Sequence, residues 1–312
     1  MIQILSGQLF TMFLMILVGF VVFKTHLTDH EGNRTLANIL LMVANSAMLL
    51  DSLLSIEYKD SILRGLLISV ALGLAVHFAM ILATQPFLGK KSAHPQIGIE
   101  RYMAVFSNCG FMGIPLVYAT FGPEAVLYLT GYLIPNNILT WSYGVPQITG
   151  KISWRQVLKG LCSPNVICIL IGLLCLLFRI QVESHVRSAA SYLGSMTTPL
   201  GMIVAGTALA ETGLSGIWKK PRLFLVTALK LAAAPIVTCL ILILARGIVP
   251  FGDEVFYGIL IPSACPAATT GTMLALRYDK DYRYASQIFV VSTLLSLVTI
   301  PIMVSFARLL AG

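Results

Sequence analysis

SNCGFMGIPLVYATFG, residues 107–122, lies in a stretch apolar enough to enter a lipid bilayer, yet it contains three glycines and one proline. Inside lipid every backbone N–H and C=O must find a partner within the protein. A helix interrupted at membrane depth is therefore tolerated only where protein buries it or where it lines a wet cavity. The stretch therefore predicts a membrane helix that is interrupted because the interruption serves a function.

The composition is typical of an integral membrane protein. Of the 312 residues 57% are apolar and 11% are charged, and the mean hydropathy is +0.86, whereas soluble proteins average about 25% charged residues. The formal charge of +8 would suggest nucleic acid as the partner of a soluble protein, but Lys and Arg lie mostly in short connections between apolar runs. We therefore expect membrane lipid as a partner and no nucleic acid, and we interpret the basic residues as a topology signal.

Windows of about 20 apolar residues predict ten membrane spans: 4–23, 35–54, 62–83, 98–121, 125–145, 164–180, 188–210, 222–245, 256–276 and 284–308. The first apolar run has no basic residues before it and no cleavage site after it, so we expect a retained helix rather than a signal peptide. The odd-numbered connections contain 14 Lys and Arg, and the even-numbered ones, with the C-terminal end, contain 6. By the positive-inside rule, both termini face outward and the odd-numbered connections are cytoplasmic.

The cysteines fall in or at the edge of apolar runs, without the paired spacing of a metal site. We expect buried structural thiols, no metal and no cofactor. The six residues are Cys109, Cys162, Cys168, Cys175, Cys239 and Cys265.

Ten spans divide into two halves of five, and because five is odd a second copy must be inverted in the membrane. The hydrophilic connection 147–163, which we expect to be cytoplasmic, would separate a first repeat, residues 1–146, from a second, residues 164–312. Ser107-Asn-Cys recurs as Ser263-Ala-Cys at an offset of 156 residues, half the chain length. A chance match in a biased composition is the alternative. Helix breakers nevertheless cluster at both places, at Gly110, Gly113 and Pro115 and at Pro262, Pro266 and Gly271.

Paired interruptions at corresponding positions indicate a transporter binding site. Each break frees up to four N–H groups at the start of the following half-helix, where the macrodipole adds about half a positive charge. Two such ends that meet at the midplane from opposite sides form an anion site without a buried arginine. The alternative is a proline kink whose freed groups are satisfied by neighbouring helices, but two kinks at matched positions favour the site.

At these residues the chain resembles the auxin efflux carrier family, which includes bacterial organic-acid permeases and the plant PIN-FORMED carriers. The resemblance covers essentially the whole chain. Residues 108–116 (NCGFMGIPL) are similar to a motif of the family's fourth helix, residues 264–266 and 285–301 to its last two helices, and residues 194–210 to its seventh. One departure is Val43-Ala-Asn-Ser46, where family members usually carry a proline; it leaves the role of Asn45 open.

The resemblance implies an all-α fold of two inverted five-helix repeats, with a scaffold of helices 1, 2, 6 and 7. The other helices, 3–5 and 8–10, would form a transport bundle in which broken helices 4 and 9 cross. It implies a secondary transporter of a small organic anion, a carboxylate or an auxin-like acid, that works by elevator-type alternating access. It further implies a bacterial inner (plasma) membrane location and a homodimer through the scaffold helices.

The predicted substrate-binding residues are Asn108, Cys109, Gly110, Gly113, Pro115, Asn137, Cys265, Pro266 and Thr269. By the resemblance Asn108 contacts the substrate, and its amide suits a carboxylate that must be released again. The alternative role is a cap at the helix break, and the two roles are compatible. Asn136 and Asn137 should face the bundle interior, and Asn137 is our choice. For Thr269 and Thr270, hydroxyls bonded back to the i−4 carbonyl are the slightly favoured alternative.

Two further residues are candidate coupling groups inside the membrane. Lys230 lies about eight residues into helix 8, where a charge costs on the order of 2.5–3.5 kcal/mol; snorkelling of its ammonium to the interface is the equally weighted alternative. His77 could relay a proton, but a lone hydrogen-bonded histidine is favoured.

Two other functional classes compete with a secondary transporter. An intramembrane enzyme would need a GxSxG or HExxH motif or a comparable constellation, and here His30-Glu31 is followed by Arg34 in place of the second histidine. A channel is not supported by a selectivity-filter motif or a ring-forming charge pattern. The sequence contains no P-loop, so we do not expect ATP-driven transport. Because the catalytic motifs are also missing, we do not expect an enzyme.

Overall fold

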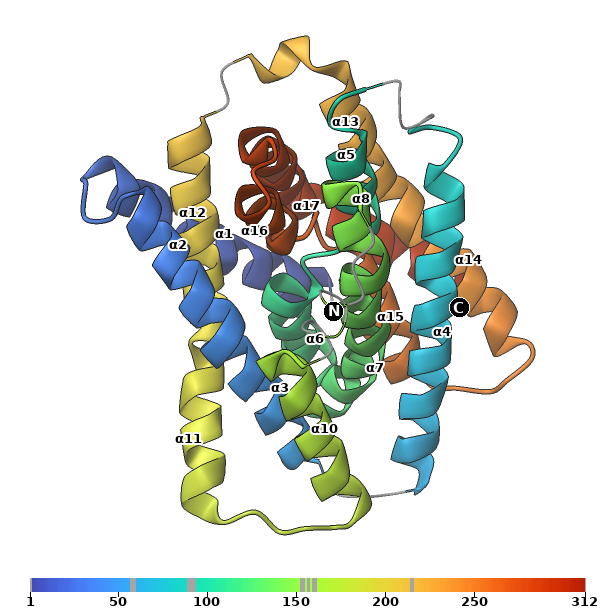
Figure 1. The fold of residues 1–312 in the computed structure, drawn as a ribbon. Coiled ribbons are helices and arrows are strands. Elements are labelled where there is room, and N and C mark those ends of the chain that lie inside the picture. Colours follow the sequence, from blue (N-terminus) through green and yellow to red (C-terminus); the bar gives the residue numbers. More distant parts are fainter. Residues whose placement is uncertain are drawn as a thin grey trace.

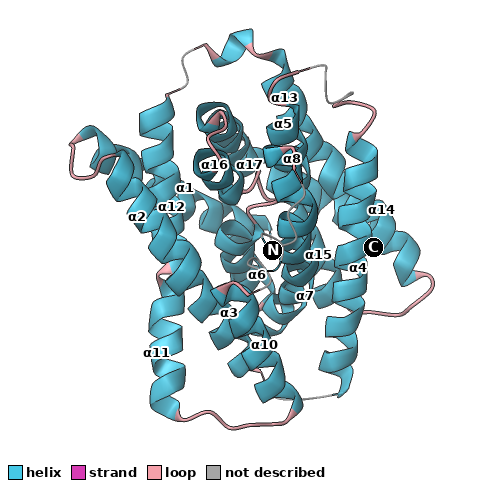
Figure 2. Ribbon diagram, in the orientation of Figure 1, coloured by secondary structure: helices cyan, strands magenta, loops and turns pink. Residues whose placement is uncertain are grey.

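The computed structural model describes residues 2–56, 60–88, 94–151, 155, 158, 162–213 and 216–311. These residues are predominantly helical and include no strand, and an isolated antiparallel bridge joins Ser107 to Ala267. Figures 1 and 2 show the helices packed against one another, with most loops at helix ends. The predicted all-helical architecture is confirmed.

The helical elements in chain order are α1 (Ile2–Lys24), α2 (His30–Ile39), η1 (Leu40–Ala44), α3 (Asn45–Leu54), α4 (Asp60–Thr84), α5 (Ile97–Val105), η2 (Cys109–Gly113), α6 (Ile114–Phe121), α7 (Pro123–Leu139), η3 (Thr140–Gly144), α8 (Val145–Thr149), α10 (Pro164–Leu177), α11 (Ser184–Ser195), α12 (Thr197–Thr212), η4 (Ile217–Lys219), α13 (Pro221–Ala228), η5 (Leu229–Ala233), α14 (Ala234–Arg246), α15 (Asp253–Ala264), α16 (Thr269–Arg277) and α17 (Tyr282–Ala311). Within this set η1, η2, η3 and η5 are π-helical turns, and η4 is a 3-10 helix.

Each of the ten predicted spans falls mainly on helical residues in the part of the chain that the structure describes. Among the described residues, six segments are long and apolar enough to cross a membrane: Gln3–Lys24, His30–Leu54, Asp60–Thr84, Ser184–Thr212, Pro221–Arg246 and Tyr282–Leu310. Cys109–Phe121 and Pro164–Leu177 are shorter apolar helices. The apolar segments support an integral membrane protein, and the inverted ten-helix repeat stays a prediction.

Two of the predicted spans are interrupted, and the second break follows directly from the sequence. Cys265 is extended (φ −62°, ψ 154°) because the ring of the following Pro266 disfavours the helical conformation of the residue before it. The first break lies at residues 106–108, where Phe106 is extended (φ −86°, ψ 131°). The glycines and Pro115, which the sequence suggested as the breakers, lie after this break and inside the helical run 109–121.

Pro115 is accommodated in that run by the π-helical turn before it. Three of the π-turns, η2, η3 and η5, end two residues before a proline: Pro115, Pro146 and Pro235. A proline lacks an N–H and its ring clashes with the carbonyl four residues earlier, which here lies inside the π-turn. We infer that the wider turn relieves this clash and lets the helix continue. η1 has Ser46 at the corresponding position, where the sequence departs from the auxin efflux carrier pattern.

Close helix packing positions the interrupted segments. α1 packs along α12, and α3 packs against α10 and α11, while α7 packs against both α4 and α15 (Figure 1). A Cβ atom on Gly206 would lie 2.0 Å from the carbonyl oxygen of Ile16, and one on Gly19 would lie 2.3 Å from that of Ile203. These two glycines therefore allow direct backbone contact between α1 and α12, as small residues do in membrane proteins.

The cysteine prediction is correct in part. Cys109, Cys239 and Cys265 are buried, whereas Cys168 and Cys175 are half-buried and Cys162 is exposed. All six are free thiols.

Candidate functional site

The two breaks meet and pair with each other. The backbone N–H of Asn108 donates to the carbonyl of Pro266 at 2.8 Å, and the N–H of Ala268 donates to the carbonyl of Phe106 at 3.0 Å. The amide of Ala267 donates to the hydroxyl of Ser292 on α17 at 3.1 Å. This two-stranded crossing satisfies backbone groups that the interruptions free inside the protein, as a buried backbone requires.

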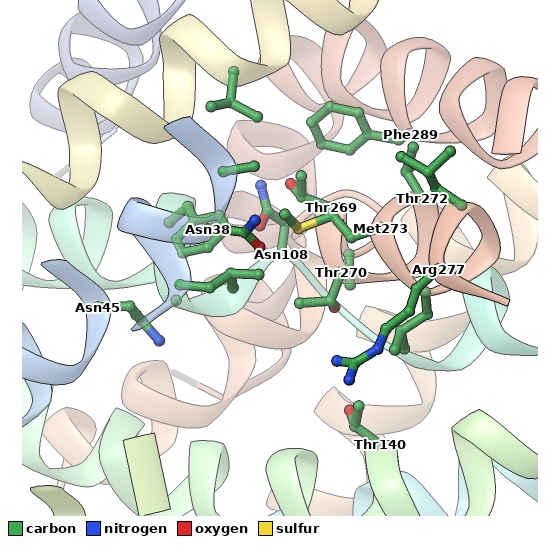
Figure 3. A pocket seen from close by; sticks show the side chains of 18 of the residues that line it. Asn38, Asn45, Asn108, Thr140, Thr269, Thr270, Thr272, Met273, Arg277 and Phe289 are labelled. Atoms are coloured by element: carbon green, nitrogen blue, oxygen red, sulfur yellow. The ribbon is translucent and has the colours of Figure 1, made fainter. Parts of the chain in front are cut away.

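A cavity of about 460 Å³ lies against one side of the crossing. Residues of α2, η1, α3, α10 and α12 line one part of its wall, and the crossing, α7, η3, α16 and α17 supply the rest. Figure 3 shows Asn108, Thr269 and Thr270 beside one another in this cavity, with Asn45 approaching from another element.

Both half-helices that follow the breaks start at the cavity. One begins at Cys109 and the other at Thr269, and Cys109, Gly110, Phe111, Thr269 and Thr270 all line it. The first amides of a helix have no partner within the helix, and they carry the positive end of its dipole. The cavity therefore faces two helix N-termini, which is the arrangement that attracts anions. The first N-terminus is at Cys109 and not after Pro115, because the helix continues through that proline.

Four buried polar side-chain atoms, on residues that line the cavity, lack a hydrogen-bond partner within the protein. They are Asn108 Nδ2, Asn45 Oδ1, Thr269 Oγ1 and Thr272 Oγ1. Native proteins pair nearly all buried polar atoms, so each exception needs an explanation. A bound polar ligand would provide the missing partners.

These contacts exclude the structural roles that the sequence left open. Asn108 precedes η2, but its side chain makes no capping hydrogen bond. The hydroxyls of Thr269 and Thr270 do not bond back to the i−4 carbonyl: the first is unpaired and the second lies 3.0 Å from the hydroxyl of Tyr102. The favoured expectation for the two threonines was therefore wrong.

Five of the nine predicted substrate-binding residues line the cavity: Asn108, Cys109, Gly110, Asn137 and Thr269. The other four, Gly113, Pro115, Cys265 and Pro266, do not line it. Gly113 packs near Pro262, since a Cβ atom on this glycine would lie 3.4 Å from the proline Cβ. Pro266 supplies a carbonyl to the crossing. Cys265 and Pro266 belong to the crossing itself, whereas Gly113 and Pro115 lie farther along the helical run 109–121.

Asn136 and Asn137 both line the cavity but have different partners. Asn137 Nδ2 donates to the Leu133 carbonyl at 3.0 Å. Asn136 Oδ1 lies 3.1 Å from His77 Nε2, and the other ring nitrogen of His77 lies 2.6 Å from the Gly73 carbonyl. His77 is buried and does not itself line the cavity. Its geometry is that of the hydrogen-bonded histidine favoured from the sequence.

Lys230 lies behind the crossing. Its side chain is 1% exposed, and its ammonium donates to Ser107 Oγ and to the carbonyl of Ser263. A snorkelling lysine would reach the interface, so that alternative is wrong. Ser107 lines the cavity and Lys230 does not, which puts the ammonium one residue behind the cavity wall.

Two contributors to the cavity were not among the predicted site residues, although the sequence left the role of Asn45 open. Asn45 faces the crossing, because a Cβ atom on Gly110 would lie 3.2 Å from Asn45 Oδ1. Arg277, which the sequence treated only as a topology charge, lines the cavity, and its guanidinium points toward Thr140 (Figure 3). The sequence spacing could have indicated this position of Arg277, since Thr269, Met273 and Arg277 are spaced four apart and share one face of a helix.

Comparison with known proteins gives the same family over nearly the whole chain. The sequence model of the family described as membrane transport protein matches residues 4–152 and 146–304. An uncharacterized transporter of Methanocaldococcus jannaschii is 25% identical over 297 residues, which cover 90% of this chain and 92% of the relative. An uncharacterized transporter of Methanothermobacter thermautotrophicus is 26% identical over 204 residues, 64% of each chain.

Proposed function

The chain belongs to the membrane transport protein family, as its resemblance to the auxin efflux carriers predicted, and we propose that it is a secondary transporter of a small organic anion. The substrate carboxylate binds at the crossing of the two broken helices. Asn108 Nδ2, Thr269 Oγ1 and the first amides of the two half-helices donate to it.

The convergence of unpaired donors on one cavity carries this proposal. The cavity is bordered by two helix N-termini, and a buried amide and a buried hydroxyl beside them have no partner in the protein. Hydrogen bonds to a charged group are worth about 1.5–3 kcal/mol each. A carboxylate has two oxygens and four lone-pair sites, which suits several donors that approach from different directions.

For the mechanism we propose elevator-type alternating access. The scaffold comprises helices 1, 2, 6 and 7 (α1–α3 and α10–α12), and the crossing moves with the transport bundle. Residues of both groups line the cavity. The two groups are also joined by a hydrogen bond, in which Thr212 Oγ1 donates to Ser286 Oγ at 2.9 Å. A homodimer through the scaffold helices would hold the scaffold still while the bundle moves.

The charged residues of the cavity favour an opening to the cytoplasm. His30, Arg34, Glu211 and Arg277 line it, and all four lie in or beside connections that the positive-inside rule makes cytoplasmic. The proposed location is the bacterial inner membrane, with both termini outside.

Transport by purified protein in proteoliposomes tests the proposal. Labelled acetate, malate and indole-3-acetate would each be offered with and without a proton gradient, and accumulation of at least one acid above empty liposomes is expected. Asn108→Ala should lower this accumulation at equal protein density. Failure of the parent protein to move or bind any organic acid would refute an organic-anion carrier.

A further inference from the structure

Lys230 occupies a position where the ends of two half-helices converge. Val105 is the last residue of α5 and Ser263 is the last but one of α15. The ammonium lies 3.5 Å from the Val105 carbonyl and 3.2 Å from the Ser263 carbonyl, and it also donates to Ser107 Oγ. Carbonyls at a helix C-terminus lack partners within the helix and carry the negative end of the macrodipole.

The crossing therefore has opposite electrostatic character on its two sides. The N-termini that begin at Cys109 and Thr269 face the cavity, whereas the C-termini that end at Val105 and Ala264 face Lys230. In transporters with interrupted helices, C-terminal ends and unwound carbonyls coordinate the coupling cation. Here the position with three oxygen neighbours holds an ammonium that belongs to the protein.

No carboxylate forms an ion pair with Lys230 among the residues that the structure describes. A buried charge without an oppositely charged partner is costly. The helix dipoles and the three oxygen atoms must therefore stabilise the ammonium. The π-helical turn η5, which precedes Pro235, contains this lysine. π-Turns of this kind are frequent at functional sites.

We propose that the Lys230 ammonium serves as a resident cation behind the anion site, so that the carrier binds its substrate without a sodium or potassium ion. This inference rests on the proposed anion site and adds the identity of its counter-charge. The ammonium compensates the carboxylate across Ser107, and no metal ion needs to enter or leave with each transport cycle.

Ion dependence of thermal unfolding tests the proposal without any substrate. Purified parent protein in detergent would be heated in N-methyl-D-glucamine chloride and in chlorides of sodium, lithium, potassium and methylammonium. The parent should unfold at the same temperature in all five salts. Lys230→Ala removes the ammonium and leaves space among the oxygens, so one small cation should raise its Tm by roughly 3–8 °C. Lys220→Ala, which removes a lysine that donates to Gln287 Oε1 at 2.7 Å, is the matched control and should show no selective effect.

Binding of labelled malate and indole-3-acetate supplies the second measurement. For an acid that the parent binds, Lys230→Ala should bind roughly ten- to a hundred-fold more weakly in N-methyl-D-glucamine and should regain affinity in the cation that stabilises it. Lys230→Met fills the space without a charge, so it should stay folded, lose affinity and show no rescue. If Lys230→Ala does not fold, the Met variant decides.

Three results would overturn the proposal. They are selective stabilisation of the parent by sodium or potassium, a folded Lys230→Ala protein with no cation response, and a Lys230→Met protein with parental affinity. If the parent binds none of the acids, the proposed function fails, while the unfolding measurements still test the resident cation.

Discussion

The backbone amide of Asn108 donates to the carbonyl of Pro266 at 2.8 Å, and this bond joins the two places where the chain interrupts a helix. The Asn108 side chain makes no capping hydrogen bond to the helix that follows. Asn108 Nδ2 is buried and unpaired at the cavity, and the remaining question is how much this donor contributes to binding.

Asn108→Ala should weaken binding of the transported acid by roughly ten- to a hundred-fold, because it removes one hydrogen bond to a charged group worth about 1.5–3 kcal/mol. Equilibrium binding to purified protein measures this loss. Asn38→Ala is the matched control, since Asn38 also lines the cavity but is exposed. An Asn108→Ala protein that is folded and binds the acid like the parent would contradict the proposed site.

Thr269→Val tests the second donor with almost no change in shape. The Thr269 hydroxyl has no partner in the protein, so its removal should leave the free energy of unfolding unchanged or slightly raised. The affinity for the acid should fall by about ten-fold or more if the hydroxyl donates to the carboxylate.

The control for this prediction is Thr227→Val. The Thr227 hydroxyl donates to the Leu223 carbonyl at 2.9 Å, away from the cavity, and its loss should leave affinity unchanged. Equal affinities for the Thr269→Val, Thr227→Val and parent proteins would remove Thr269 from the site.

A buried ion pair away from the cavity should contribute to stability. Glu100 is 0% exposed, and Arg222 donates to both of its oxygens, at distances from 2.6 to 3.0 Å. Tyr284 donates to the same carboxylate at 2.9 Å, so the group joins α5, α13 and α17. Removal of one partner from a buried pair lowers the free energy of unfolding by about 3–5 kcal/mol. Arg222→Gln should lie at the lower end of this range because the Arg222 side chain is 31% exposed.

Thermal or denaturant unfolding in detergent measures this effect. Arg246→Gln is the control, since Arg246 pairs with the exposed Asp253 at 2.8 Å and such pairs contribute about 0–1 kcal/mol. Glu100→Gln combined with Arg222→Gln should recover part of the lost stability, because no buried carboxylate then remains without its arginine partner. Equal effects of the two single arginine substitutions would contradict the prediction.

The sequence was sufficient to predict the helices and the two interrupted regions, because apolar length and helix breakers act locally. Pro266 shows this directly, since its ring determines the conformation of Cys265. Pro115 shows the limit: a π-turn accommodates it, and the actual break lies earlier, at residues without a proline. Whether a proline breaks or only widens a helix depends on its packing environment, which is not encoded locally.

Long-range geometry explains the other differences from the sequence predictions. Nothing near Asn45 in the sequence shows that its amide faces Gly110. Likewise, a lysine within an apolar run is compatible with snorkelling or burial, and only the convergence of Val105, Ser107 and Ser263 from two distant segments distinguishes them. Glu100 was overlooked because two of its partners, Arg222 and Tyr284, are more than 100 residues away, whereas His94, whose Nδ1 lies 3.2 Å from Glu100 Oε1, is close in the sequence.

Arg277 should attract the substrate into the cavity. It lies eight residues beyond Thr269 on α16, about 12 Å along the helix axis, and its side chain lines the cavity. At about 10 Å and an effective dielectric constant between those of protein and water, one charge contributes roughly 1 kcal/mol. Arg277→Gln should therefore weaken binding about five-fold in low salt, and the difference should shrink at high ionic strength because salt screens exposed charges.

Lys280→Gln removes an equal charge from an exposed residue that does not line the cavity and should have a smaller effect. Equal losses for both variants would indicate a general surface field, and a loss that high salt does not reduce would indicate direct contact between Arg277 and the bound acid.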